Sequence, residues 1–184
     1  MKFTVFTVFV ASAAALTQQS PLNRREMLGS IVATGIASAI VAEPANALEA
    51  CKKGSKNCIR TTWTPPASSS KAGTIASLKK ALESYPKGGQ DKVDLGGWEL
   101  VEDNFSSGKA RLEYKSGVGN FANFFNGGKP FVDDLKLEIE DTGLVQVRSS
   151  SRVGDSDLGV NQKRLKYLGK TLQAAGWTIP EANY

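Results

Sequence analysis

The sequence contains no histidine and only two cysteines among its 184 residues. The absence of histidine excludes Ser-His-Asp and Cys-His nucleophile systems, His-ligated zinc and histidine ligands to haem or chlorophyll. Two cysteines are too few for a zinc site or an iron–sulfur cluster built from cysteine alone within one chain. Much of the usual catalytic repertoire is therefore missing, and we expect neither a metal nor another cofactor.

The composition is that of a globular protein. Hydrophobic residues make up 41% and charged residues 22% of the chain, which is too apolar for a disordered protein. The formal net charge is +5, from 23 basic and 18 acidic residues. Because basic and acidic residues are interspersed, the pattern indicates a solvated surface and does not favour nucleic-acid binding.

The first sixteen residues have the order of a secretory signal peptide. Lys2 is followed by an apolar run, Phe3–Val10, and then by small residues, Ala11–Ala15. A buried N-terminal strand is the alternative, because Thr, Val and Phe alternate in this stretch. The position at the terminus and the alanine-rich exit favour the signal peptide.

A second signal follows the first. The pair Arg24-Arg25 precedes sixteen uncharged residues of moderate hydrophobicity, Met27–Ala42, and the pattern Ala45-Asn46-Ala47 supplies a small-x-small cleavage site. This order resembles a twin-arginine translocation signal. A membrane anchor is the alternative, but a bilayer needs about 20 apolar residues, and the cleavage site argues for removal.

Two such signals in series resemble the presequence of a thylakoid-lumen protein in an alga whose plastid lies inside the endomembrane system, as in diatoms. We therefore expect residues 1–47 to be removed on the way to the lumen. Residues 48–72 would form an N-terminal extension, and residues 73–184 a single domain. The removed part holds Lys2, Arg24 and Arg25 against Glu26 and Glu43, so the mature net charge would be +4.

The extension contains both cysteines. After export, Cys51 and Cys58 are expected to form a disulfide that closes a short loop, although reduced thiols without a special role remain the alternative. Thr64–Ser70, with two prolines and three serines, is typical of a linker.

Hydrophobic periodicity predicts two helices and four strands. One helix covers Thr74–Tyr85; the other is capped by Ser156 or Asp157, runs to about Ala175 and is closed by Gly176. The predicted strands are Trp98–Val101, Lys109–Lys115, Leu135–Glu140 and Leu144–Ser150, the last two joined as a hairpin by Asp141-Thr142-Gly143. The sequence therefore predicts an α+β fold, an antiparallel sheet of about four strands packed by an N-terminal and a C-terminal helix.

Three phenylalanines crowd among glycines and asparagines in Gly119–Pro130. Phe121, Phe124 and Phe125 either belong to a short helical turn that buries the rings, or form an exposed aromatic loop for a partner. We expect burial, because aromatic side chains carry much of the apolar area of a small domain.

The densest polar run is Arg148–Arg164, between a predicted strand and a predicted helix. With two preceding aspartates, its candidate site residues are Asp133, Asp134, Arg148, Ser149, Ser151, Arg152, Asp155, Asp157, Asn161 and Arg164. Three stretches resemble the domain-of-unknown-function-1499 family: Asn57-Cys58, Phe131–Asp134, and Val147–Asn161 with Arg164. No activity is established for that family, so the resemblance implies a domain covering nearly all of Cys51–Trp177 and implies no chemistry.

The run has three interpretations. The favoured one is structural: Asp157 caps the helix, and Arg148 and Arg152 pair with Asp133, Asp134 or Asp155. The second is an anion site at the helix N-terminus, against which the nearby aspartates weigh. The third is a Ca²⁺ or Mg²⁺ site made by the four aspartates, but the spacing is not that of an EF-hand and the arginines would compete with the cation.

Three classes of function follow. The first is a noncatalytic lumenal protein, an extrinsic or assembly subunit of a photosynthetic membrane complex, peripheral to the membrane at most and without His-ligated chlorophyll. The second is a small-ligand-binding or enzymatic domain that uses the Arg148–Arg164 run. The third, a redox protein using Cys51 and Cys58, is disfavoured because the spacing is not C-x-x-C. We favour the first.

Overall fold

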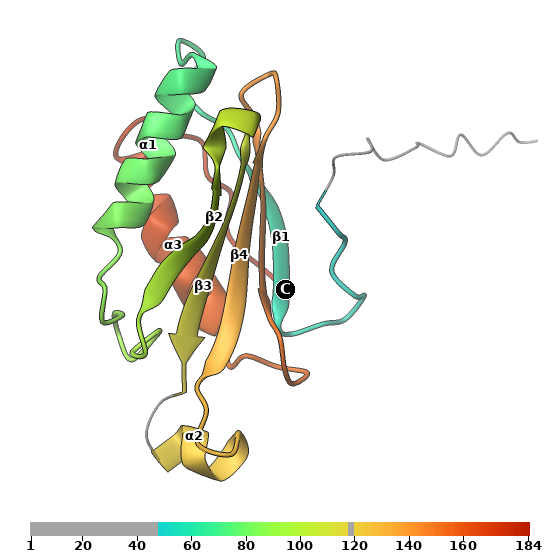
Figure 1. Cartoon of the computed structure of the whole chain (residues 1–184). Coiled ribbons are helices and arrows are strands. Elements are labelled where there is room, and N and C mark those ends of the chain that lie inside the picture. The colour runs from blue at the N-terminus through green and yellow to red at the C-terminus, as the bar shows by residue number, and fades with distance from the viewer. Residues whose placement is uncertain (1–47, 118–119) are drawn as a thin grey trace, which may run out of the picture. The chain divides into compact units, whose positions relative to one another are not determined.

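Five antiparallel strands form one sheet, and two helices cover one of its faces (Figure 1). The computed structural model describes residues 48–117 and 120–184; the predicted presequence, residues 1–47, lies outside the described residues. The strand order across the sheet is β1-β5-β4-β3-β2. In chain order the elements are β1 (Cys58–Trp63), α1 (Lys71–Ser84), β2 (Trp98–Asn104), the 3-10 turn η1 (Phe105–Ser107), β3 (Lys109–Ser116), α2 (Asn120–Phe125), β4 (Phe131–Ile139), β5 (Val145–Ser151) and α3 (Val160–Gln173).

The α+β class and the antiparallel sheet are confirmed, but the sheet has five strands where about four were predicted. The fifth strand is β1, which forms one edge of the sheet by pairing with β5 from Cys58 opposite Ser150 to Trp63 opposite Val145. Its inward positions are Ile59, Thr61 and Trp63. Because a threonine interrupts the apolar alternation, the strand has no clear period of two, and the first element of the fold is a strand instead of a helix.

Strands β3 and β4 follow the predicted alternation, whereas β2 has no buried residue and does not alternate. In β3, Ala110, Leu112 and Tyr114 are buried while the residues between them face solvent on the other side of the sheet. The β4–β5 hairpin is confirmed, and its turn is closed by a hydrogen bond from the Gly143 amide to the Glu140 carbonyl. Strand β4 begins at Phe131, four residues before the predicted start, so Asp133 and Asp134 lie within the sheet.

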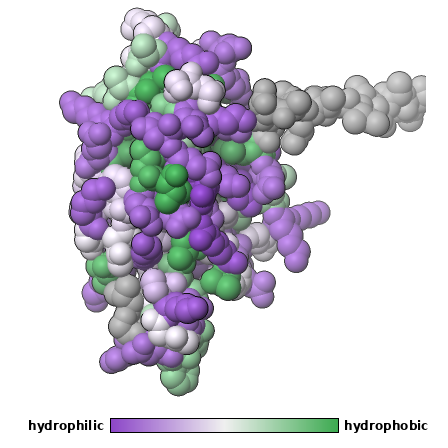
Figure 2. All heavy atoms as spheres, in the orientation of Figure 1, coloured by the Kyte–Doolittle hydropathy of each residue, from purple (hydrophilic) through white to green (hydrophobic). Residues whose placement is uncertain are grey.

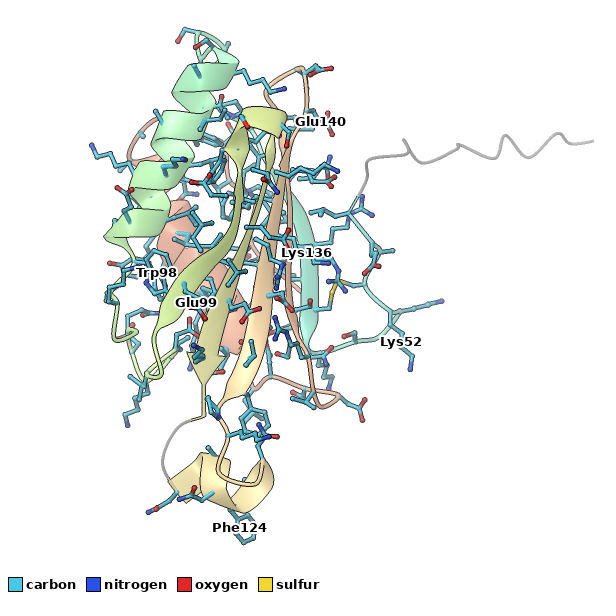
Figure 3. All side chains as sticks on the ribbon, in the orientation of Figure 1. Lys52, Trp98, Glu99, Phe124, Lys136 and Glu140 are labelled. Atoms are coloured by element: carbon cyan, nitrogen blue, oxygen red, sulfur yellow. A yellow bond between two sulfur atoms is a disulfide. The ribbon has the colours of Figure 1, made fainter. Side chains whose placement is uncertain are left out.

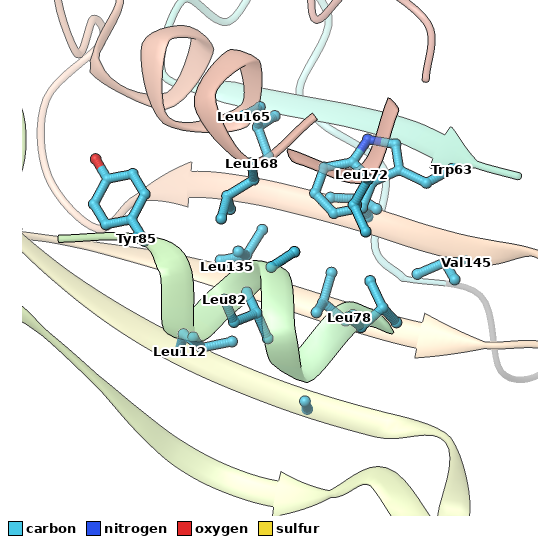
Figure 4. Packing of buried hydrophobic residues seen from close by; sticks show 14 of the residues in the cluster. Trp63, Leu78, Leu82, Tyr85, Leu112, Leu135, Val145, Leu165, Leu168 and Leu172 are labelled. Atoms are coloured by element: carbon cyan, nitrogen blue, oxygen red, sulfur yellow. The ribbon is translucent and has the colours of Figure 1, made fainter. Parts of the chain in front are cut away.

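Both predicted helices are present and pack on the same face. Helix α1 begins three residues before the predicted start, because the Ser70 hydroxyl accepts a hydrogen bond from the Gly73 amide. Helix α3 is followed by a turn in which Gly176 adopts the left-handed conformation (φ 83°), as its predicted closing role requires. Figure 4 shows how the two helices and the sheet share one apolar layer, with the labelled residues Trp63, Leu78, Leu82, Tyr85, Leu112, Leu135, Val145, Leu165, Leu168 and Leu172.

Helix α2 connects β3 to β4 beyond the end of the sheet, where no layer covers it (Figure 1). Phe124 is 82% and Phe125 62% exposed, so the expectation that these rings are buried is wrong. The side chain of Phe121 lies outside the described residues. None of the helices within the described part of the chain has the length and apolarity that a bilayer crossing requires.

Candidate functional site

The most concentrated polar cluster of the described domain surrounds Arg164, whose side chain has no exposure to solvent. Its Nε and Nη2 donate to the two carboxylate oxygens of Asp94 at 2.7 and 2.6 Å, and Nη2 also donates to Asp133 Oδ2 at 2.6 Å. Its Nη1 donates to Asn161 Oδ1 at 2.7 Å and to Ser149 Oγ at 3.1 Å. These five contacts use all five N–H groups of a guanidinium. We call Arg164 and these four partners the arginine cage.

Two tyrosines complete the surroundings of the cage. The guanidinium lies 4.3 Å from the centre of the Tyr114 ring, in cation–π geometry. The Tyr85 hydroxyl donates to Asp94 Oδ2 at 2.7 Å, and the two tyrosine rings meet edge to face at 5.3 Å. Burial raises the pKa of both Tyr85 and Tyr114 above the ordinary value, so both hydroxyls stay protonated.

The charge of Arg164 is held by its carboxylate partners. Burial alone acts to lower the pKa of a guanidinium, but hydrogen bonds and charge from Asp94 and Asp133 outweigh it, and the pKa of Arg164 is raised. The cation and both carboxylates have little or no exposure, so removing any one of them would leave a buried charge without its partner and would strongly destabilise the fold.

Asp94 is the cage residue that sequence reasoning missed. It lies in the loop between α1 and β2, fully buried, with a left-handed backbone (φ 57°) that is unfavourable for aspartate. The loop is tight: Gln90 and Val93 exchange two backbone hydrogen bonds, and a Cβ at Gly89 would lie 2.1 Å from the Val93 carbonyl oxygen. The sequence signal that could have pointed to this loop is the two glycine pairs on either side of it, at 88–89 and 96–97. Glycine pairs indicate a turn, but they do not show that Asp94 is buried and paired with Arg164.

The start of α3 is occupied by Asp157. Its carboxylate accepts from the Gly159 amide at 2.9 Å and from the Asn161 amide at 2.8 Å, so it binds amides at the helix start as predicted, although the helix begins at Val160 and its N-cap position is Gly159. The Tyr184 hydroxyl donates to the same carboxylate at 2.5 Å, and the Asn161 side-chain amide donates to it and to Ser151 Oγ. An anion at this helix end would have to displace the protein's own carboxylate.

On the opposite face of the sheet, Asp134 belongs to a second set of ion pairs. Arg152 Nε donates to Asp134 Oδ2 at 2.8 Å and Arg152 also contacts Glu113, while Arg111 bonds Glu113 at 2.8 Å and Asp134 at 3.0 Å. We call these four residues the outer ion-pair set; Glu102 joins it through Arg111 at 2.7 Å.

The arginines of the outer set lower the pKa of both its carboxyls. For Asp134, burial acts to raise the pKa, but hydrogen bonds from Arg152 and Arg111 outweigh it. For Glu113, the hydrogen bond from Arg152 is the main cause. Both carboxylates are therefore ionised well into the acidic range.

The expected partners of Arg148 are wrong. The register places Arg148 on the outward face of β5, opposite Arg60 on one side and Lys136 on the other. Its Nη1 donates to Ser150 Oγ at 2.8 Å and its Nη2 lies 4.0 Å from Glu49, so it pairs with none of the aspartates proposed for it.

The four aspartates considered as cation ligands do not converge. Asp133 and Asp134 point to opposite faces of β4, Asp157 caps α3, and Asp155 is exposed on the loop between β5 and α3. No group of three side chains suited to a metal ion occurs in the described ranges. The disulfide between Cys51 and Cys58 is formed as predicted, with the Cα atoms 5.6 Å apart.

Fold and site together define a two-layer α+β domain in which the strand-to-helix run from β5 to α3 closes around a buried arginine. Residues 42–172 match the family described as protein of unknown function (DUF1499), and the chain belongs to this family. A comparison with curated proteins found no match.

Proposed function

We propose that the chain is a noncatalytic accessory subunit in the thylakoid lumen, bound at the membrane surface to a photosynthetic membrane complex. The two targeting patterns within residues 1–47 support this location. The observation that carries the proposed docking role is the aromatic end of the domain, formed by α2. The membrane complex is the partner that a lumenal address and an exposed aromatic surface fit best.

The aromatic end consists of Phe124 and Phe125, with exposed fractions of 82% and 62% and ring centres 4.8 Å apart. Figure 3 shows Phe124 at the tip of α2, pointing away from the sheet. In the space-filling view most of the visible face is hydrophilic, and apolar atoms lie at this end and in small patches elsewhere (Figure 2). Aromatic residues, phenylalanine among them, are enriched at protein interfaces, and exposed apolar patches mark interaction sites.

The arginine cage supports a noncatalytic role in a different way. Arg164, Asn161 and Ser149 direct their polar atoms to one another and to Asp94 and Asp133 inside the domain. A substrate could reach them only by breaking those hydrogen bonds. The buried members of the run, Ser149, Asn161 and Arg164, therefore act as an internal frame of the domain, and we assign the contact with a partner to the surface.

The test compares two variants in thylakoids of a diatom-type alga that expresses the tagged chain. Phe124→Ser/Phe125→Ser removes the aromatic end, and Leu95→Ser changes another exposed apolar residue, 50% exposed, as a control. After gentle solubilisation and native-gel separation, the unaltered chain and the Leu95 variant should migrate with a photosystem band, and the double variant should not. Migration of the unaltered chain only as a free monomer contradicts the proposal.

A further inference from the structure

A groove with a cavity volume of about 460 Å³ lies between α3 and the C-terminal tail, Trp177–Ala182. The tail turns back along the helix and is held at both ends of the groove. Gln173 donates a side-chain hydrogen bond to the Ile179 carbonyl at 3.3 Å, and Gln162, about three turns earlier, donates to the Ala182 carbonyl at 2.8 Å. At its start the tail is joined to the end of β1 by two backbone hydrogen bonds between Thr64 and Thr178. The groove is therefore built into the fold.

The floor of the groove is apolar and recessed. It includes Trp63, with 1% exposure, and Leu165, with 2%; Figure 4 shows both within the apolar layer under α3. Ile179, Pro180 and Ala182 form the wall on the side of the tail. Gly169 lets the tail pack closely against the helix, since a Cβ there would lie 2.9 Å from the Ile179 side chain.

The rim of the groove is basic. Lys163, Lys166 and Lys170 are three exposed lysines spaced along one side of α3, and none has an ion-pair partner among the residues that the structure describes. Glu181 is the acidic residue in the lining and likewise has no such partner there, so the groove carries a net positive charge of two. The spacing of three and four residues places the lysine side chains on one face of the helix.

We propose that this groove binds one anionic amphiphile, a long-chain acyl carboxylate, with the chain on the apolar floor and the head group among the three lysines. A small inorganic anion would leave the floor unused, and an uncharged hydrocarbon would leave the lysines without a partner. A flat bilayer surface cannot enter a groove between a helix and the tail that runs along it, whereas a single chain can. The volume lies in the range of small-molecule sites. This site is separate from the aromatic end and does not depend on the docking role.

Trp63 provides the readout. Palmitate that carries bromine atoms on its chain, used below the concentration at which it forms micelles, should quench the tryptophan fluorescence of the protein because bromine quenches only on close approach. Unlabelled palmitate should compete and restore the fluorescence. Replacing Trp63 by Phe keeps an aromatic floor and should remove most of the quenching.

The lysine rim is tested with a charge-matched pair of variants. Lys163→Gln/Lys166→Gln/Lys170→Gln should weaken binding by about tenfold or more, which corresponds to about 1.4 kcal/mol. Lys52→Gln/Lys53→Gln/Lys80→Gln removes the same number of exposed charges elsewhere and should bind as the unaltered protein does. The brominated methyl ester, which has the chain without the charge, should bind about tenfold more weakly than the acid.

Three results would overturn the site: no quenching by brominated palmitate, equal affinity for acid and ester, or equal affinity of the two triple variants. A fourth is binding only to vesicles that contain anionic lipid, without binding of the monomeric acid, which would assign the lysines to a membrane surface. The Phe124→Ser/Phe125→Ser variant should bind the acid normally, so failure of this site and failure of the docking role are distinguishable.

Discussion

Asp133 and Asp134 are neighbours in β4, and each pairs with an arginine of the same run of sequence, yet their surroundings are opposite. Asp133 faces the core and Arg164, with both side chains at 0–1% exposure. Asp134 faces solvent and Arg152, with side-chain exposures of 15% and 43%. Both pairs join an aspartate to an arginine, so a difference in how much each contributes to stability must come from burial. A buried charge that loses its partner has no water to replace it, whereas an exposed charge does.

The largest effect should come from removing the buried cation. Arg164→Met keeps much of the side-chain volume but leaves the carboxylates of Asp94 and Asp133 buried without the guanidinium cation. We expect the free energy of unfolding to fall by about 3–5 kcal/mol, measured by urea denaturation. Lys163→Met, one residue away on the exposed side of α3, is the control and should change it by less than about 0.5 kcal/mol. A loss of less than about 1 kcal/mol for Arg164→Met would mean that the cage does not hold the domain together.

A smaller loss is expected for Asp94→Asn, which keeps the shape of the side chain and removes its charge. Arg164 then loses one of its two carboxylate partners, and Tyr85 donates to a neutral oxygen, so we expect a loss of about 1.5–3 kcal/mol. Because the two residues act on each other, the double variant Arg164→Met/Asp94→Asn should lose less than the sum of the single losses, by about 0.5–3 kcal/mol. Additive losses would show that Asp94 acts independently of Arg164.

The difference between the buried and the solvent-exposed face of the sheet also determines which strands could be predicted from the sequence. The alternation in Lys109–Lys115 and Leu135–Glu140 has one wet and one apolar face, and it correctly predicted two central strands. The confirmed hairpin joins the second of these strands to the predicted strand Leu144–Ser150. Strand β1 was missed because Thr61 occupies its middle inward position, so the only signal was Ile59 and Trp63 four residues apart. An edge strand with two inward apolar residues forms through pairing and packing with its neighbours, which the local sequence does not show.

The site was predictable to a similar degree. The run Arg148–Arg164 could be recognised as important, and Asp157 as a cap, because these contacts are local in sequence. The partnership of Arg164 with Asp94 spans 70 residues and depends on a loop with a left-handed aspartate, for which no periodic pattern exists. Phe124 and Phe125 were expected in the core from side-chain type alone. Their exposure follows from the position of α2 past the end of the sheet, which only the tertiary structure shows.

The outer ion pairs should matter much less than the cage. Arg152→Ala removes the donor to Asp134 and Glu113, both of which retain hydrogen bonds from Arg111. We expect a loss of about 0.2–1 kcal/mol in the free energy of unfolding, and less in high salt because the pairs are exposed. Lys166→Ala, an exposed lysine without an ion pair in the described domain, is the control for a general charge effect. If Arg152→Ala lowers the free energy of unfolding as much as Arg164→Met does, burial does not explain the difference between the outer ion pairs and the cage.

The smallest effect, and the one with a defined sign, is the pH dependence of the outer set. The pKa of Asp134 is lowered in the folded protein, so the folded state binds its proton less readily than the unfolded state does. The contribution of the carboxylate to stability is therefore fully present above the unfolded pKa of about 3.9, and it is lost as the pH falls below that value through the lowered folded pKa.

Asp134→Asn removes this titration. The difference in free energy of unfolding between the unaltered protein and the variant should be constant above about pH 5 and should shrink as the pH falls below about 4, as followed by denaturation at a series of pH values. Glu113→Gln should behave in the same way, because the pKa of Glu113 is also lowered, chiefly by Arg152. If this difference in free energy of unfolding grows on acidification instead, the folded protein favours the protonated carboxyl, and the outer set does not stabilise the ionised forms.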